Sequence, residues 1–143
     1  MKIRRVLLSL ASVWLVSVAM PAGAQTMQKA VLRTSEVSTY RTSAAHHIYK
    51  IYGKSIYKGM LPPLVHAVVV VETEVDALGR VKNVRAVRSP SHAPDVTESV
   101  IGMINSASPF PAPSSAGGAK FVEVWLVDHS GRFQLHALTE GQR

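Results

Sequence analysis

The side chains that could carry enzyme chemistry in this 143-residue chain form no complete catalytic motif. Ser55 and Lys58 form a Ser-x-x-Lys pair, which on a helix would share one face, but the companion Ser-Asp-Asn and Lys-Thr-Gly motifs are missing. Glu72 and Glu74 lie two residues apart, and we expect them to face solvent from one strand rather than to act as an acid–base pair. The chain has no cysteine, which excludes disulfides, thiolate nucleophiles and Cys-ligated metals.

Six histidines are a second source of chemistry, but their spacing does not match a metal site. None forms the paired spacing of a helical zinc site, and no acidic residue accompanies them as in His-Glu-x-x-His. Adjacent histidines on a helix point about 100° apart, so two neighbours do not easily share an ion. We therefore predict six surface histidines, no metal, no cofactor and no enzymatic activity. The six are His46, His47, His66, His92, His129 and His136.

The first 24 residues have the three-part pattern of a secretory signal peptide. A basic start is followed by the apolar residues 6–20 and by the small-residue ending Ala22-Gly23-Ala24. The apolar stretch is shorter than the roughly 20 residues that span a bilayer core, which favours cleavage before Gln25 over a retained anchor. The prediction is a periplasmic protein, and the alternative is an inner-membrane anchor with the domain facing the periplasm.

Composition and charge favour one exported globular domain. With 47% hydrophobic and 17% charged residues, the chain is too apolar and too weakly charged for a disordered protein. Removing residues 1–24 lowers the net charge from +7 to +4, that is, 13 basic minus 9 acidic residues, which does not indicate nucleic-acid binding. Six basic residues and one acidic residue lie within residues 25–60. This asymmetry marks either a basic surface that docks on an acidic partner or an ordinary solvated helix face.

Hydrophobic periodicity predicts two helices. Residues 25–39 are polar without a sustained period, and we interpret them as a short linker that spans about 50 Å when extended. An apolar stripe then predicts a helix over residues 40–58, ended by Gly59 and Pro62-Pro63. A second helix is predicted to start at Pro94. The predicted stripes are Ala44, Ala45, Ile48, Ile51, Tyr52 and Ile56 in the first helix and Val96, Val100, Met103, Ile104 and Ala107 in the second.

Four strands complete the predicted domain. Residues 64–75 and 81–88 predict a hairpin, and residues 121–127 and 133–138 predict a second strand pair. Alternation places Val81, Arg85 and Val87 on one face of the second strand. The third strand should place Phe121, Glu123, Trp125 and Val127 on one face. Helices on one face of a small antiparallel sheet would bury these stripes, so residues 40–143 are predicted to form an α+β two-layer sandwich of order α-β-β-α-β-β.

This order and several short motifs resemble the C-terminal domain of TonB-type energy transducers and, more distantly, that of TolA. The motifs are Gly79-Arg80-Val81-Lys82-Asn83-Val84, Phe110-Pro111-Ala112-Pro113 and the proline step at Leu61-Pro62-Pro63. The resemblance covers about residues 44–127. The chain departs from the family at Leu61-Pro62, where the family has Tyr-Pro, and lacks the tryptophan ahead of the Phe-x-Pro segment. It also lacks a long Pro-rich spacer.

The resemblance implies a non-catalytic protein-binding domain that captures an extended segment of an outer-membrane receptor by strand addition, in energy-dependent transport. Candidate edges are residues 121–127 and 133–138, and a basic surface could steer an acidic segment. The predicted partner-binding residues are Lys50, Lys54, Lys58, Phe121, Glu123, Trp125, Phe133 and Leu135. Two alternatives stay open: a membrane-anchored minimal transducer in an inner-membrane complex, and an envelope ligand-binding module that shares only the fold. A homodimer formed by strand exchange is also open.

Overall fold

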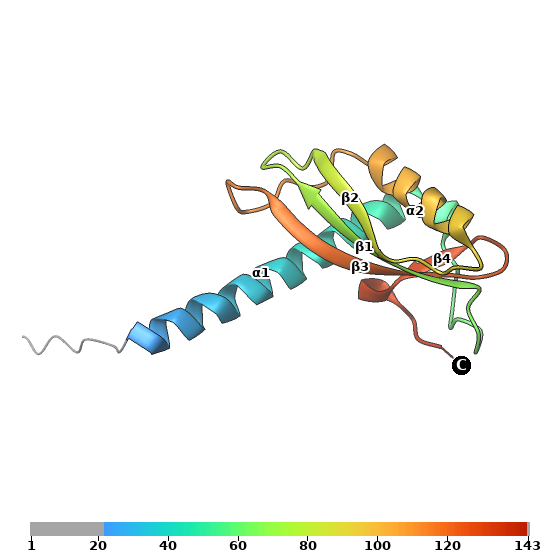
Figure 1. Ribbon diagram of the computed structural model, residues 1–143, viewed down its shortest axis with the longest axis horizontal. Helices are drawn as coiled ribbons and strands as arrows, with labels where there is room; N and C mark the ends of the chain where they lie inside the picture. The colour runs from blue at the N-terminus through green and yellow to red at the C-terminus, as the bar shows by residue number, and fades with distance from the viewer. Residues whose placement is uncertain (1–21, 143) are drawn as a thin grey trace, which may run out of the picture.

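A computed structural model describes the backbone of residues 22–142 and the side chains of residues 34–142. Most of the expected signal segment therefore lies outside the described residues. The order α-β-β-α-β-β and the α+β class are confirmed (Figure 1). The elements are α1 (Ala22–Ile51), β1 (Ala67–Val75), β2 (Val81–Arg88), α2 (Pro94–Ser106), β3 (Ala119–Val127) and β4 (Phe133–Leu135), with short 3-10 helices at Gly53–Ser55 and His136–Leu138.

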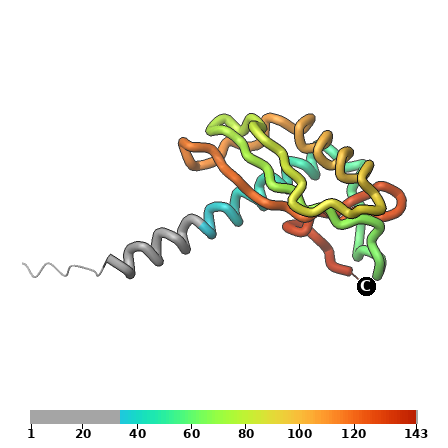
Figure 2. Tube along the Cα trace, in the orientation of Figure 1, coloured from blue at the N-terminus to red at the C-terminus, as the bar shows by residue number. Residues whose placement is uncertain are grey.

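Helix α1 is longer at its start than predicted and runs through the expected linker. Residues 34–39 are exposed, so this part of the helix needs no apolar stripe, which is why periodicity did not reveal it. Residues 25–39 consequently span about 22 Å as helix instead of about 50 Å as extended chain. Figure 2 shows residues 34–39, at the start of the coloured part of α1, projecting from the body of the domain.

At its other end α1 stops at Ile51, seven residues before the predicted end at Lys58. Gly53 begins a single 3-10 turn, and the chain is extended from Ile56 onward. Ser55 and Lys58 therefore do not share a helix face, which removes the geometric basis of the Ser-x-x-Lys pair. Ile51, the last residue of α1 and predicted to belong to the apolar stripe, is 47% exposed, so the stripe ends before it.

The four strands form one antiparallel sheet in the order β2-β1-β3-β4. The central strands β1 and β3 pair without interruption from Ala67↔Val127 to Val75↔Ala119. Buried and half-buried residues alternate along the whole of β1, which gives the sheet one covered and one open face.

The faces of β2 differ from the prediction because the strand is bulged at both ends. Val75 pairs with Val81, but Glu74 pairs with Asn83, so one extra residue interrupts the alternation near Lys82. Val81 therefore turns to the core together with Val84, and not together with Arg85 and Val87 as predicted.

Both helices cover the same face of the sheet and enclose the core. Helix α1 contributes Ala44, Ala45 and Ile48, and α2 contributes Val100 and Ile104, each of them buried. The predicted inward face of β3 is confirmed: Phe121, Glu123, Trp125 and Val127 are at most 6% exposed. Aromatic rings join the layers, with Tyr40 of α1 edge-on to Phe121 at a centroid distance of 5.5 Å.

The last predicted strand is shorter than expected. β4 ends at Leu135 and passes into the 3-10 helix His136–Leu138. The carboxamide of Gln134, 1% exposed, donates to the carbonyl oxygens of Tyr57 and Gly59, and so holds the 57–59 loop against β4.

Candidate functional site

The two glutamates of β1 lie on the open face of the sheet, as predicted. Arg85 donates to Oε1 of Glu72 at 3.0 Å, and Lys120 pairs with both Glu72 and Glu74. The hydrogen bond from Arg85 lowers the pKa of Glu72 below its ordinary value. Both carboxylates thus belong to a surface network of ion pairs, and the lowered pKa of Glu72 is the opposite of what a general acid needs.

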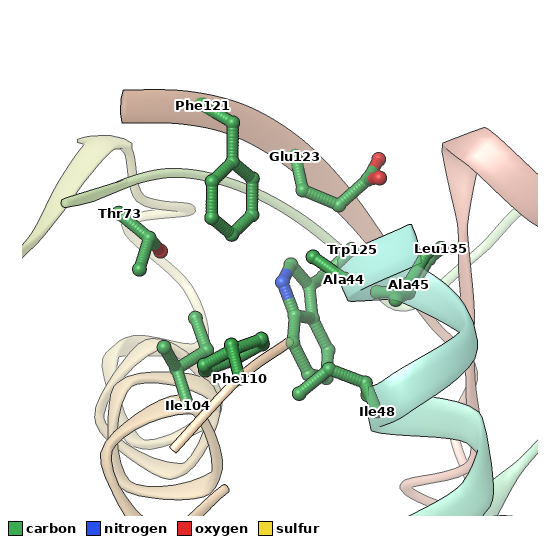
Figure 3. Close-up of a pocket in the computed structure, with 10 residues that line it drawn as sticks. All are labelled: Ala44, Ala45, Ile48, Thr73, Ile104, Phe110, Phe121, Glu123, Trp125 and Leu135. Atoms are coloured by element: carbon green, nitrogen blue, oxygen red, sulfur yellow. The ribbon is translucent and has the colours of Figure 1, made fainter. Parts of the chain in front are cut away.

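The interior offers no room for a small-molecule ligand at the junction of the helices and the sheet. A cavity lies there between α1, α2 and β3, and Figure 3 shows Phe121, Glu123 and Trp125 bordering it from β3. Its volume is about 10 Å³, which is space for roughly one water molecule. A ligand larger than a water molecule does not fit in this cavity.

Glu123 is a buried charge in this junction. Its Oε1 accepts hydrogen bonds from the backbone N–H groups of Val124 and Ala137, while its Oε2 lies 4.0 Å from Nε of Arg41. Within the described side chains, neither Oε2 nor that Nε has a hydrogen-bond partner. Burial raises the pKa of Glu123, and the two backbone bonds and Arg41 offset this only in part.

One side of β3 is open over most of its length. All nine residues of β3 pair with β1, but on the other side β4 pairs only with Trp125, Leu126 and Val127. Residues 119–124 consequently have no neighbouring strand on that side among the described residues. We call this segment the open edge of β3.

The hydrogen bond at Val124 shows which main-chain groups the open edge presents. The Val124 N–H donates to the Glu123 carboxylate and therefore points away from β1. Main-chain groups of an antiparallel strand point alternately to its two neighbours, so the N–H and C=O groups of Lys120 and Val122 also point outward. The Glu123 carboxylate thus already accepts the outward N–H of Val124, and Lys120 and Val122 remain available to pair with an added strand.

A groove runs between the open edge and the exposed start of α1. One hollow of about 410 Å³ is lined by residues of α1 and β3, together with Glu72 of β1, and a second of about 370 Å³ continues it toward the 113–118 loop. The wall from α1 combines hydroxyl groups with one apolar side chain, Val37, which is 44% exposed. On the β3 side Val122 is 41% exposed. The first hollow is lined by Thr34, Val37, Ser38, Arg41, Glu72, Lys120, Phe121 and Val122.

Strand β2 forms the other edge of the sheet, but its features disfavour pairing with a further strand. It carries a register shift near each end, and its exposed side chains include Lys82, Arg85 and Arg88. Bulges and basic side chains are common means by which proteins protect sheet edges. The open edge of β3 has neither a bulge nor a comparable run of charge, so it is the better candidate for strand addition.

The structure separates the predicted partner-binding residues into two groups. The side chains of Phe121, Glu123, Trp125, Phe133 and Leu135 are buried, so these residues could contact a partner only through their main chain. Lys50, Lys54 and Lys58 are exposed, and the last two line a hollow of about 520 Å³ together with Arg132. Tyr57, between these two lysines, donates its N–H to the Phe133 carbonyl of β4, so Lys54 and Lys58 lie beside the β4 end of β3 and not beside the open edge.

Sequence reasoning missed the α1 wall of the groove and the residue Arg132. Residues 34–39 have no apolar stripe, so the sequence predicts a linker there and not a helix. Arg132 joins the two lysines because Tyr57 N–H donates to the Phe133 carbonyl, a pairing between distant segments that no local pattern reveals.

Among residues 34–142, no group of three or more His, Asp or Glu side chains stands in an arrangement that could hold a metal ion. No helix within residues 22–142 has both the length and the apolar character needed to cross a membrane. Neither a protein-family model, nor a curated protein, nor a solved structure matches this chain.

Proposed function

We propose that this chain is a non-catalytic periplasmic protein-binding domain of the TonB C-terminal type. It captures an extended segment of a protein partner, such as an outer-membrane receptor, by strand addition at the open edge of β3. The observation that carries the proposal is the open edge itself, residues 119–124, which lies beside a groove and lacks the protection found on β2. The sequence motifs of the TonB C-terminal family support the same assignment.

The geometry of the open edge predicts a weak and transient complex. Lys120 and Val122 offer two N–H and two C=O groups, and each main-chain hydrogen bond adds about 1 kcal/mol. Apolar contacts with Val37 and Val122 add to this, while association itself costs several kcal/mol. We therefore expect a modest affinity for the added strand, with specificity set by the partner side chains that enter the groove.

Acidic and basic side chains both lie near the groove, so the groove selects only weakly by the charge of the partner. Arg41 and Lys120 are balanced by Glu36 and Glu72, and Lys120 is already paired with Glu74. The basic group Lys54, Lys58 and Arg132 lies at the other end of β3, about 25–30 Å along a nine-residue strand. It can steer an acidic partner toward the domain, which changes the association rate more than the affinity.

The proposal is tested with a panel of ten-residue extended peptides in which Val alternates with Thr, or with Glu in the acidic members and Lys in the basic members. Binding to the full-length chain is followed by fluorescence anisotropy in the wild type and in two variants. Val122→Pro removes an outward N–H and places a ring where the added strand would lie, whereas β1 pairing is kept. Val122→Thr is the matched control, because it keeps the N–H and the branched shape.

We expect Val122→Pro to weaken peptide binding about tenfold or more, and Val122→Thr to change it less than about threefold, in line with the loss of one or two hydrogen bonds. Circular dichroism and thermal melting confirm that both variants are folded. Equal binding by Val122→Pro and wild type would contradict strand addition at this edge. So would the absence of binding by every peptide at millimolar concentration.

A further inference from the structure

The fold brings together three histidines that are far apart in the sequence. His66 lies just before β1, His92 just before α2, and His129 in the turn between β3 and β4. The ring centroids of His66 and His129 are 4.6 Å apart, and those of His66 and His92 are 5.5 Å apart. Three of the six histidines therefore meet at one end of the sheet, remote from the open edge of β3.

The spacing of His66 and His129 suits two imidazoles that share one metal ion. A nitrogen ligand lies about 2.0–2.1 Å from Zn²⁺, which places each ring centroid about 3.1 Å from the ion. Two such rings stand about 4.4 Å apart at a coordination angle of 90° and about 5.1 Å apart at the tetrahedral angle. The observed 4.6 Å falls inside this range. Since His129 is exposed, rotation about its side-chain bonds can bring a ring nitrogen to the ion without moving the backbone.

The surroundings fix the backbone at His129 and the ring of His66. The turn that carries His129 is fixed by Asp128, whose Oδ1 accepts bonds from the backbone N–H groups of Ser130 and Arg132. His92 packs edge-on against the ring of His66, and its Nε2–H donates to the His66 carbonyl oxygen at 2.7 Å. This bond ties the start of α2 to the start of β1, so the ring of His66 is confined between His92 and His129.

We propose that His66 and His129 form a two-histidine site for a divalent transition-metal ion. The remaining coordination positions are open to water or to an external ligand, which agrees with the absence of a ready three-ligand group among the described residues. Neutral imidazole suits Cu²⁺, Ni²⁺ and Zn²⁺, and Cu²⁺ is bound most tightly of the three by a given set of nitrogen ligands. The site is independent of strand capture, because it uses none of the residues of the groove.

The site is tested by titrating the full-length chain with Cu²⁺ at pH 7.5. Calorimetry gives the stoichiometry and the affinity, and electron paramagnetic resonance counts the imidazole nitrogens bound to the ion. His66→Gln and His129→Gln each remove one proposed ligand. The matched control is the double variant His46→Gln/His136→Gln, which removes two exposed histidines that lie outside this cluster.

We expect one equivalent of Cu²⁺ bound by two imidazole nitrogens, with an affinity that falls at least about tenfold in each single variant and stays unchanged in the double variant. His129→Gln changes only an exposed turn residue, so it remains informative if His66→Gln perturbs folding. Wild-type affinity in both single variants would overturn the proposal. An equal loss in the control would also overturn it, because binding would then be spread over surface histidines.

Discussion

The substitution Gln134→Ala tests how the C-terminal tail and the 57–59 loop are held on the sheet. The Gln134 Nε2 donates to the Tyr57 and Gly59 carbonyls at 2.9 and 2.7 Å, and its Oε1 accepts from Thr139 Oγ1 and Glu140 N–H at 2.9 and 3.1 Å. Truncation leaves three backbone groups without a partner, each worth about 0.5–1.5 kcal/mol. We therefore expect a loss of about 3 kcal/mol in the free energy of unfolding.

The assay is urea denaturation together with amide hydrogen exchange. A loss of about 3 kcal/mol corresponds to a fall of roughly 12 °C in the melting temperature of a domain of this size. Exchange should accelerate at the Tyr57 amide, bonded to the Phe133 carbonyl, and at the Leu61 amide, bonded to the Gly141 carbonyl.

Gln142→Ala is the matched control, because Gln142 also donates to two backbone carbonyls but is exposed. It should cost no more than about 0.5 kcal/mol. If Gln134→Ala were as mild as this control, or if exchange at Tyr57 and Leu61 stayed slow, the account of this network would be refuted.

Four further substitutions test the core, one turn, the buried charge and the basic surface. Trp125→Ala should cost about 3–5 kcal/mol in urea denaturation, because the side chain is 1% exposed, and an unchanged melting temperature would contradict its place in the core. Gly79→Ala should cost more than about 2 kcal/mol by the same assay, since φ is +80° and a Cβ atom would collide with the Phe110 carbonyl, so a stable variant would refute this packing. Burial raises the folded-state pKa of Glu123, so the free energy of unfolding should fall as the pH rises from the unfolded-state pKa of about 4.3 through the folded-state pKa. Denaturation between pH 4 and 7 measures this fall, which should disappear in Glu123→Gln. The double change Lys50→Glu/Lys54→Glu should leave the melting temperature nearly unchanged and slow the association of acidic peptides in stopped-flow measurements, and an unchanged rate would reduce these lysines to ordinary surface residues.

The parts of the fold that depend on local periodicity were predictable. The alternation from Phe121 to Val127 places Trp125 in the core because a strand has period two, and the structure agrees. Helix α2 starts at Pro94 as predicted, because proline suits the first turn and apolar residues recur at helical spacing. In both elements the hydrophobic periodicity is visible in consecutive residues, without knowledge of the rest of the fold.

The parts that depend on tertiary pairing were not predictable. The start of α1 touches no core within residues 34–39, so it lacks the stripe by which helices are recognised. The bulge near Lys82 moves Val81 to the opposite face, and a bulge leaves no clear mark in a run such as Val81 to Arg88.

The candidate sites also depend partly on local sequence and partly on tertiary pairing. The choice of the third strand as an edge came from the sequence, but its open part is defined by where β4 stops, at Leu135. The meeting of His66 with His129 depends on the β1–β3 register, in which Ala67 faces Val127. No spacing along the chain encodes either contact.

The most direct test of strand capture is an isotope-edited NMR experiment on the full-length chain with the tightest peptide of the panel. The account predicts intermolecular contacts between peptide backbone protons and the amides of Lys120 and Val122, with those two amides protected from exchange upon binding. Contacts confined to β2, or to Lys54, Lys58 and Arg132, with no protection on β3, would contradict it.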